Sequence, residues 1–417
     1  MQIKKTKYFI MLIIIPIMLA GACSSLDGIG MYSGSPSGGR DSYISSGELG
    51  DKADDTSQNG DVAIAAGQLT AAEWNDNKNY DFWQTLFMPD SNQQKGAFED
   101  FKSIINFYSL SRIVLNITAQ SSPAVNARAE LYHNGEKLYT AISDMTGKAY
   151  LFTNDLQEGA ELDLTVIYGA TQLNSKIDYV QGGQTVEIEL NSQSVTPQNK
   201  LELMFVVDTT GSMGDELEYL KSEIKDVVDR VKLANPQLDI SIALLFYRDK
   251  GDEYVTRYFD FTTEIEVQKQ NISRQSANGG GDFEEAVHTA LTEAAAKQWS
   301  SNSTARLILH ILDAPPHLED YQQYSTAVFN LASQGVRLIP VASSGIDKTT
   351  EYLLRNQAML TGGTYVFLTD DSGIGGSHLP PSTGEYVVEY LNALLVRVIN
   401  EYCSGVAQEP VPYRESQ

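Results

Sequence analysis

The stretch Leu-Glu-Leu-Met-Phe-Val-Val-Asp-Thr-Thr-Gly-Ser-Met, residues 201–213, decides the fold class. Its apolar, β-branched run at 203–207 ends on a carboxylate, which is typical of a buried parallel strand at the carboxyl edge of an open sheet. Ligands gather at that edge. Asp208, Thr210 and Ser212 alternate, so a tight loop can direct one carboxylate and two hydroxyls at one point. Because hard divalent cations prefer such oxygen ligands, the stretch predicts a metal site.

This loop resembles the metal-ion-dependent adhesion site of the von Willebrand factor A family, which opens with Asp-x-Ser/Thr-x-Ser after the first strand. Asp208, Thr210 and Ser212 match that pattern. A helix is predicted directly afterwards, because apolar residues recur at helical spacing from about 215 to 234. The resemblance implies an α/β fold over residues 200–405, with a doubly wound, mostly parallel, Rossmann-like sheet.

Strand-like and helical runs alternate through the rest of this region. Such alternation predicts a parallel sheet covered on both faces, here with one antiparallel hairpin pair. Further strands are expected at 240–247, 254–261, 306–312, 336–342 and 364–368, and helices at 282–299, 319–333, 347–360 and 386–403.

A glycine-rich loop at 278–286 should supply the second part of the site. Its three glycines, the last of them Gly281, allow the backbone to come close to an ion. Asp282 stands where it would cap the following helix. Most members of the family have a Thr ligand here, whereas a branch that resembles the A domain of certain atypical alpha-kinases has Gly-Gly-Gly-Asp. Asp282 is therefore either a helix cap or the metal ligand of this loop, and it could serve as both.

The third part of the site follows the run at 307–312. This run ends on Asp313, and the resemblance implies that a carboxylate here is the last site residue. The sequence Asp-Ala-Pro-Pro-His, residues 313–317, also occurs in the kinase-associated branch. His317 either contacts the metal or a partner, or is a hydrogen-bonded loop residue. A later loop at 369–383 is long enough to fold over the site.

The resemblance implies a division of labour among these ligands. Thr210 and Ser212 would bind the cation directly, Asp208 and Asp313 would act partly through water, and one position would stay open to a carboxylate from a partner. Mg²⁺ is expected, with Mn²⁺ or Ca²⁺ as alternatives. Asp282 in place of a neutral Thr would strengthen metal retention and weaken the attraction of an acidic ligand.

Two acids in the later loop, Asp370 and Asp371, and the loop residues Gly281 and His317 are candidates for supporting the ligands from outside the coordination sphere. The alternative for Asp370 and Asp371 is that they are turn residues.

The start of the chain has the features of a secretory signal peptide at residues 1–22. Three lysines precede an apolar stretch at 8–19, and small residues lead to Cys23. The stretch at 19–23 resembles a bacterial lipobox, which implies cleavage before Cys23 and lipid attachment to its sulfur. Two acyl chains hold a protein stably on a membrane. We therefore expect a lipoprotein anchored to a membrane of the cell envelope, outside the cytoplasm.

Composition divides the chain around the A-type domain. Residues 23–66 are rich in Ser, Gly and Asp, which predicts a disordered tether, and residues 406–417 read as a disordered tail. Residues 67–110 are rich in aromatics and are expected to pack on the next domain. Short alternating runs at 111–196 predict a small antiparallel β-sandwich. Residues 143–151 resemble a turn of carboxypeptidase-regulatory-like and immunoglobulin-like modules.

Charge and motifs narrow the function. Asp and Glu number 54 against 30 Lys and Arg, a formal net charge of −24, so nucleic acid is not expected as a partner. No kinase phosphate loop, kinase catalytic loop or catalytic triad order is found, so no catalytic residue is assigned. The sequence predicts non-catalytic, metal-dependent binding of an unidentified envelope or extracellular protein. The alternative is a metal-dependent hydrolase that uses the same aspartates to activate water.

Overall fold

The computed structural model describes residues 64–89, 92 and 94–414, which belong to one compact unit. The predictions for the signal peptide at 1–22, for lipidation at Cys23 and for most of the tether fall outside these residues. Within the described ranges, no helix combines the length and the apolarity needed to cross a bilayer.

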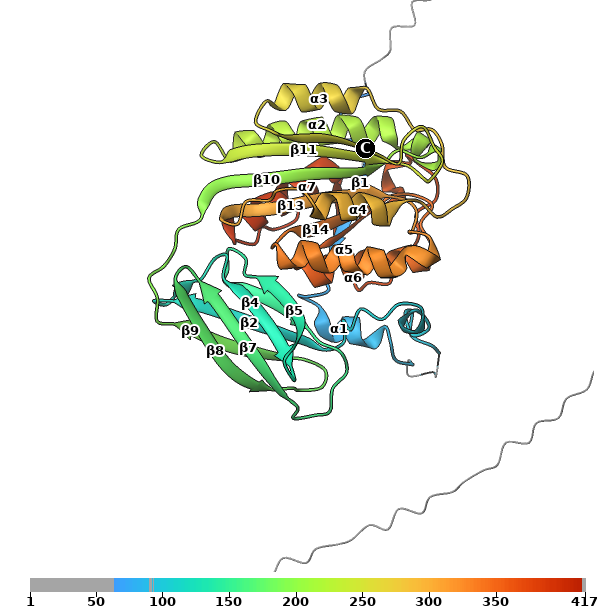
Figure 1. The fold of residues 1–417 in the computed structure, drawn as a ribbon. Coiled ribbons are helices and arrows are strands. Elements are labelled where there is room, and N and C mark those ends of the chain that lie inside the picture. The colour runs from blue at the N-terminus through green and yellow to red at the C-terminus, as the bar shows by residue number, and fades with distance from the viewer. Residues whose placement is uncertain (1–63, 90–91, 93, 415–417) are drawn as a thin grey trace, which may run out of the picture. The chain divides into compact units, whose positions relative to one another are not determined.

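An eight-stranded sheet is the centre of the A-type domain (Figure 1), with the strand order β12-β11-β10-β13-β14-β15-β1-β16. The five strands from β11 to β15 in this order run parallel, and β12 pairs antiparallel with β11. The predicted fold class is therefore confirmed. The strands are β1 (Thr70–Trp74), β10 (Gln198–Asp208), β11 (Asp239–Tyr247), β12 (Thr256–Thr262), β13 (Ser303–Leu312), β14 (Arg337–Ala342), β15 (Tyr365–Leu368) and β16 (Val388–Tyr390).

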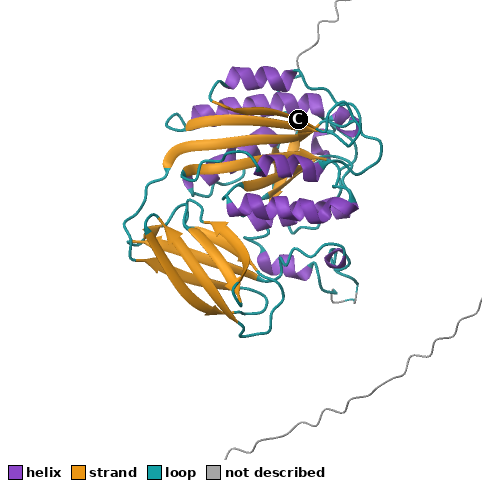
Figure 2. Ribbon diagram, in the orientation of Figure 1, coloured by secondary structure: helices purple, strands orange, loops and turns teal. Residues whose placement is uncertain are grey.

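Helices cover both faces of this sheet, as Figure 2 shows. Along β10, Leu203, Phe205 and Val207 face the core under α2 and α7, whereas Met204 and Val206 face the core under α4, α5 and α6. Successive strand residues point to opposite faces, so a strand covered on both sides must be apolar throughout. The helices are α2 (Leu217–Ala234), α3 (Ile265–Ser273), α4 (Val287–Ala295), α5 (Tyr321–Ser333), α6 (Lys348–Thr361) and α7 (Leu391–Ser404).

Three helices differ from the prediction. α3 was not expected, since its nine residues hold only three apolar side chains, Ile265, Val267 and Ile272. α4 begins at Val287 rather than at 282, because the glycine-rich loop continues to its N-cap, Ala286. α7 begins at Leu391 rather than at 386, because the preceding residues form β16.

The aromatic segment at 67–110 packs partly on the sandwich, as expected: the ring of Tyr80 lies 3.8 Å from the guanidinium carbon of Arg112, and Gln84 donates a hydrogen bond of 2.8 Å to the carbonyl oxygen of Gly182. The rest of the segment belongs to the A domain. Its first part, β1, lies within the A-domain sheet and pairs antiparallel with both β15 and β16. Ala71 and Ala72 are fully buried, one in each core, where small side chains leave room for the covering helices. The later aromatics pack largely on α6: the rings of Phe98 and Phe101 lie 5.4 Å and 5.6 Å from that of Tyr352.

The sandwich consists of two four-stranded sheets. One has the order β3-β2-β6 with β9 beside β2, and the other has the order β5-β4-β7-β8. It was predicted to be antiparallel, but β9 pairs parallel with β2. Its strands are β2 (Arg112–Ala119), β3 (Ser122–Pro123), β4 (Arg128–His133), β5 (Glu136–Ile142), β6 (Lys148–Phe152), β7 (Glu161–Tyr168), β8 (Thr171–Asp178) and β9 (Gln184–Leu190).

The sandwich contacts the A domain at the amino ends of its strands. Arg306, in β13, donates a hydrogen bond of 2.7 Å to Asn126, and Arg337, at the start of β14, donates one of 2.9 Å to the carbonyl oxygen of Ile142. These contacts lie at the edge of the sheet opposite the predicted metal loops. The sandwich therefore leaves the carboxyl edge uncovered.

The end of the chain also differs from the prediction of a disordered tail. Tyr413 donates its backbone N–H to the carbonyl oxygen of Val388 in β16, at 2.6 Å, and its ring lies 5.1 Å from that of Tyr390. The described residues of the tail, 406–414, thus run beside the outer strand of the sheet.

Candidate functional site

The turn after β10 brings three of the predicted ligands together. Asp208 is fully buried, and its Oδ1 accepts hydrogen bonds from the backbone N–H and the hydroxyl of Thr210, at 2.8 Å and 2.7 Å. The hydroxyl oxygens of Thr210 and Ser212 are 3.2 Å apart. The alternation of these residues places their oxygens on one side of the turn, as the sequence predicts.

Asp313 reaches the same point from the neighbouring strand. β10 and β13 pair in parallel up to Val207 and Ile311, so the residues that follow both strands emerge side by side. Burial raises the pKa of Asp313 to about 6, against the opposing effect of the nearby Ser212 hydroxyl. Burial, followed by the charge of Asp313, raises the pKa of Asp208 to about 7. We call Asp208, Thr210, Ser212 and Asp313 the cup.

A third carboxylate faces the cup, and sequence reasoning missed it. Glu285 is buried at 2% exposure, and burial, then the charge of Asp208, raises its pKa to about 9. A Cβ added to Gly280 would lie 2.8 Å from its Oε1 and 3.4 Å from Cβ of Thr210, so Glu285 packs beside the turn. Gly280 has a φ of +71°, which glycine adopts readily. The signal available in the sequence was an acid next to Ala286, at the end of the glycine-rich loop.

Each of three acids around this point has one buried oxygen without a hydrogen-bond partner. They are Oδ2 of Asp208, Oδ1 of Asp313 and Oε2 of Glu285, each unpartnered among the residues that the structure describes. Tyr247, whose buried hydroxyl is also without an aligned partner, lies beside Asp208 and lowers its pKa. Unpaired buried carboxylate oxygens are costly, and a cation would satisfy them. The donors present, carboxylates and hydroxyls, fit a hard divalent ion.

Asp282, predicted as a ligand of the same ion or as a helix cap, does not cap α4. α4 begins after Ala286 and has no side-chain cap, and Asp282 is exposed. Its carboxylate gathers instead with Asp249 and His317, and one ligand atom from each lies within 4.8 Å of the others. The ring nitrogen Nε2 of His317 is 2.8 Å from Oδ1 of Asp249. Two carboxylates and an imidazole could hold a transition metal rather than Mg²⁺.

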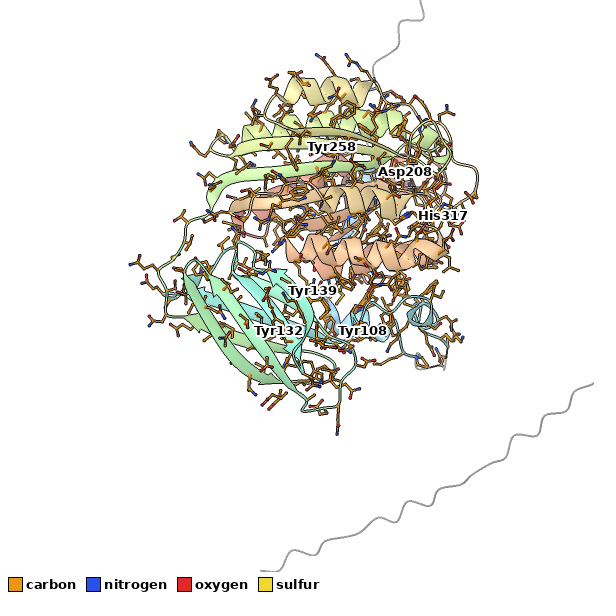
Figure 3. All side chains as sticks on the ribbon, in the orientation of Figure 1. Tyr108, Tyr132, Tyr139, Asp208, Tyr258 and His317 are labelled. Carbon is orange, nitrogen blue, oxygen red and sulfur yellow. The ribbon has the colours of Figure 1, made fainter. Side chains whose placement is uncertain are left out.

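The pKa of His317 is shifted upward. Its burial lowers the pKa, but the hydrogen bond to Asp249 and the charges of Asp249 and Asp282 outweigh that effect. Figure 3 shows His317 beyond Asp208, at the same edge of the sheet. The structure thus places His317 in a group next to the cup.

The remaining candidates have other roles. A Cβ at Gly281 would meet no atom within 4 Å, so no close approach requires glycine there. Asp370 accepts a hydrogen bond from Nδ1 of His378 at 2.7 Å. The other ring nitrogen of His378 is 3.1 Å from Oε1 of Glu216, which is buried and whose charge raises the pKa of Asp313. Asp371 is exposed in the adjoining turn, Asp370–Ser372.

The loop at 369–383 therefore reaches the neighbourhood of the cup through His378. The sequence did not indicate this role of His378. Asp370 fixes the ring of His378, and Glu216 contacts that ring and acts through its charge on Asp313.

Comparison with known proteins agrees with this geometry. Residues 202–370 match the von Willebrand factor A domain. Alpha-protein kinase vwkA of Dictyostelium discoideum is 27% identical over 207 residues, which are 46% of this chain and 33% of the kinase. Putative ariadne-like RING finger protein R811 of Acanthamoeba polyphaga mimivirus is 32% identical over 120 residues, 29% of this chain and 12% of that protein. The chain thus spans a third or less of these relatives.

Two solved structures are also similar. One is conserved hypothetical protein BatB from Bacteroides thetaiotaomicron, with 14% identity, a TM-score of 0.32 and coverage of 40% of this chain and 89% of that one. The other is an aerotolerance-related membrane protein from Bacteroides fragilis NCTC 9343, with 15% identity, a TM-score of 0.33 and coverage of 49% of this chain and 100% of that one. The family match coincides with β10, the cup and the strands that carry it. Residues 202–370 of this chain are therefore similar to the von Willebrand factor A domain.

Proposed function

We propose that this chain is a non-catalytic lipoprotein of the cell envelope that binds another protein through a divalent cation at the carboxyl edge of its A domain. The observation that carries the proposal is the set of buried, unpaired oxygens on Asp208, Asp313 and Glu285. Three acids that face one another without a counterion repel, and a cation between them would turn that repulsion into attraction.

The residues of the cup would hold Mg²⁺, or alternatively Mn²⁺ or Ca²⁺. Thr210 and Ser212 would contribute hydroxyl oxygens, and Asp208 and Asp313 would contribute carboxylates, with Glu285 as a further carboxylate that faces them. A bound ion would supply a coordination position for an oxygen of the partner. The chain's own residues orient that position, because the Thr210 turn and the end of β13 are both held by the sheet.

A measurement of stability with and without metal tests this site. Saturating Mg²⁺ or Mn²⁺ should raise the free energy of unfolding of the full chain, by about 2.7 kcal/mol at a hundred times the dissociation constant. Asp208→Asn should remove this gain and should raise the stability of the metal-free protein, since it removes one of the repelling charges. Asp371→Asn, in an exposed turn, is the matched control and should keep the gain. A wild-type chain that gains nothing from either ion contradicts the proposal.

The non-catalytic part of the proposal rests on motifs that the sequence lacks. The kinase resemblance concerns a protein of which this chain matches 33%, and no kinase phosphate loop or catalytic loop is present. A screen for phosphatase and esterase turnover with Mg²⁺ or Mn²⁺ separates binding from hydrolysis. Turnover that disappears in Asp208→Ala would favour the hydrolase instead.

Anchoring through Cys23 is proposed from the sequence alone. Radiolabelled palmitate should enter the chain in bacterial cells, and Cys23→Ser should abolish the label and release the protein from the membrane fraction. Cys403→Ser is the control, because this second cysteine is buried in α7. Equal labelling of Cys23→Ser would rule the anchor out.

A further inference from the structure

We propose that the metal-site edge of the A domain docks a partner segment that combines basic and apolar side chains. The inference rests on the proposed function and specifies the chemistry of the partner. It differs from the acidic partner that the adhesive resemblance implies.

The charge of the loops around the cup is the first observation. Four loops meet at this edge, residues 208–216, 248–255, 274–286 and 313–320, and each contains three carboxylates. Together they contain only three Lys or Arg residues, Arg248, Lys250 and Arg274, and one histidine, His317. One divalent cation offsets two negative charges, so this edge stays strongly negative when the metal site is filled.

Two of the three Lys and Arg side chains are already engaged. Arg248 is buried and donates hydrogen bonds to the carbonyl oxygens of Thr209 and Ser276, at 3.1 Å and 2.9 Å. Lys250 pairs with Asp320 at 2.6 Å. Arg248 also pairs with Glu253 at 3.5 Å, so these two cations offset two of the twelve carboxylates. The remaining excess of acids means that a carboxylate from a partner would approach a surface of its own sign.

Large apolar side chains stand among these acids. Phe283 is 43% exposed and Leu318 is 64% exposed, although the A domain has two well-formed cores in which to bury such residues. Phe283 follows Asp282 and Leu318 follows His317, and the ligand atoms of Asp282 and His317 lie within 4.8 Å of each other.

The loops that carry them are also tied together. Glu285 donates its backbone N–H to the carbonyl oxygen of Pro315, at 2.9 Å, and pairs with Pro316 in a parallel bridge. The two apolar side chains therefore stand on neighbouring loops beside the same acidic group. We call Asp252, Asp282, Phe283, Glu284, Leu318 and Glu319 the acidic rim.

The chemistry of the rim selects its occupant. Lys or Arg side chains would be drawn to the carboxylates, and an aromatic or aliphatic side chain would cover Phe283 and Leu318. Arg suits both parts of the rim, since its guanidinium pairs with carboxylates and stacks on aromatic rings. Exposed apolar groups with a polar surround mark protein-binding surfaces in general. A basic and apolar protein segment satisfies both parts of the rim.

An unbiased selection tests this preference. A display library of random dodecapeptides is panned on the full chain in detergent with saturating Mg²⁺. The enriched peptides should contain Lys or Arg together with an aromatic or aliphatic residue and should be depleted in Asp and Glu. The apparent affinity of the best peptide should fall about tenfold or more between low and high salt, because exposed charges are screened. Enrichment of acidic peptides, or a composition equal to that of the unselected library, overturns the proposal.

Matched variants locate the binding surface. Phe283→Ser and Leu318→Ser should each weaken the best peptide about fivefold or more, and Glu284→Gln combined with Glu319→Gln about tenfold. Leu233→Ser, at an 83% exposed position near the end of α2, and Glu136→Gln, on an exposed strand of the sandwich, are the controls and should change nothing. Equal effects of test and control variants would refute the rim.

Failure of the rim and failure of the metal site give different results. If the chain gains stability from Mg²⁺ but selects acidic peptides, the proposed metal site is supported and the proposed role of the rim is refuted. A chain that gains nothing from Mg²⁺ or Mn²⁺ loses the metal site, and panning in EDTA then shows whether the rim still selects basic peptides.

Discussion

At the scale of single residues, the site is governed by the burial of three acids and, second to it, by repulsion among carboxylates. Asp208, Asp313 and Glu285 are buried, and all three have raised pKa values, of about 7, 6 and 9. Burial is the largest cause in each case, and neighbouring carboxylates add to the shift in all three through their charge. A cluster of this kind is stable either protonated or with a cation, and at neutral pH the cation is the alternative that keeps Asp208 and Asp313 ionised.

The pH dependence of stability follows from these shifts. An acid whose pKa is higher in the folded than in the unfolded chain binds more protons when folded, so stability falls as pH rises between the two values. For Glu285 this window runs from about 4.5 to about 9. In EDTA, the free energy of unfolding should therefore decrease from pH 5 to pH 9, by an amount on the order of a few kcal/mol.

The variant Glu285→Gln isolates the contribution of Glu285 to this decrease in the free energy of unfolding with pH. This variant should lose less stability than the parent chain between pH 7 and pH 9 in denaturant titrations, because an amide does not ionise. Glu284→Gln, one position earlier and less buried, should behave like the parent. If Glu285→Gln followed the same pH profile as the parent, Glu285 would not be part of the coupled group.

At the scale of elements, β1 is the feature that completes the sheet. It occupies the place between β15 and β16, and Glu223 on α2 fixes the chain that leads into it. The carboxylate of Glu223 accepts the backbone N–H groups of Gly67, Gln68 and Leu69, at 2.8 Å to 3.2 Å. The buried carboxylate of Glu223 thus supplies the hydrogen-bond acceptors that the carbonyl groups of a neighbouring strand would otherwise supply.

Removal of that carboxylate should be costly. Glu223→Ala leaves three backbone N–H groups without an acceptor next to the core, so we expect a loss of about 3 kcal/mol in the free energy of unfolding. Glu218→Ala removes an exposed carboxylate of the same helix that pairs with the buried Lys221, and it should cost less than about 1 kcal/mol, because Lys221 keeps its hydrogen bond to the carbonyl oxygen of Gln275. Urea denaturation of both variants measures the difference, and equal losses would mean that Glu223 does not hold the entry of β1.

At the scale of the whole molecule, the sandwich and one face of the A domain share a core. A continuous group of buried apolar residues runs from the sandwich to the helices α5 and α6. Tyr139 of the sandwich lies 5.7 Å from the ring of Phe329 on α5 and donates a hydrogen bond of 2.7 Å to the carbonyl oxygen of Leu360. Elements that share a core tend to unfold together.

Scanning calorimetry should therefore show one transition for the sandwich and the A domain. Mg²⁺ should shift that whole transition to higher temperature, although the cup lies at the edge of the sheet opposite the sandwich. Tyr139→Ala should weaken the coupling and broaden or split the transition. Two separate transitions in the wild-type chain, with only one moved by Mg²⁺, would show that the two parts fold independently.

Local pattern alone was enough to predict much of this protein. The apolar run of β10, the alternation of Asp208, Thr210 and Ser212, and the acid at the end of β13 are short-range features, and the rules of parallel sheets place such residues at one edge. Six of the eight strands of the A-domain sheet, β10 to β15, and five of its six helices follow from periodicity for the same reason, although α4 and α7 begin later than predicted.

Long-range packing decided the rest. The place of β1 depends on pairing with residues almost 300 positions later, and five residues with two alanines carry no local sign of that partner. Whether Asp282 or Glu285 faces the cup depends on where the glycine-rich loop ends. It also depends on the hydrogen bond between the backbone N–H of Glu285 and the carbonyl oxygen of Pro315, which holds Glu285 beside the neighbouring loop. The sequence by itself determined the fold class and four residues of the cup. Only the tertiary structure decided which acid of the second loop faces them, because side-chain direction in an irregular loop is set by its contacts and not by its period.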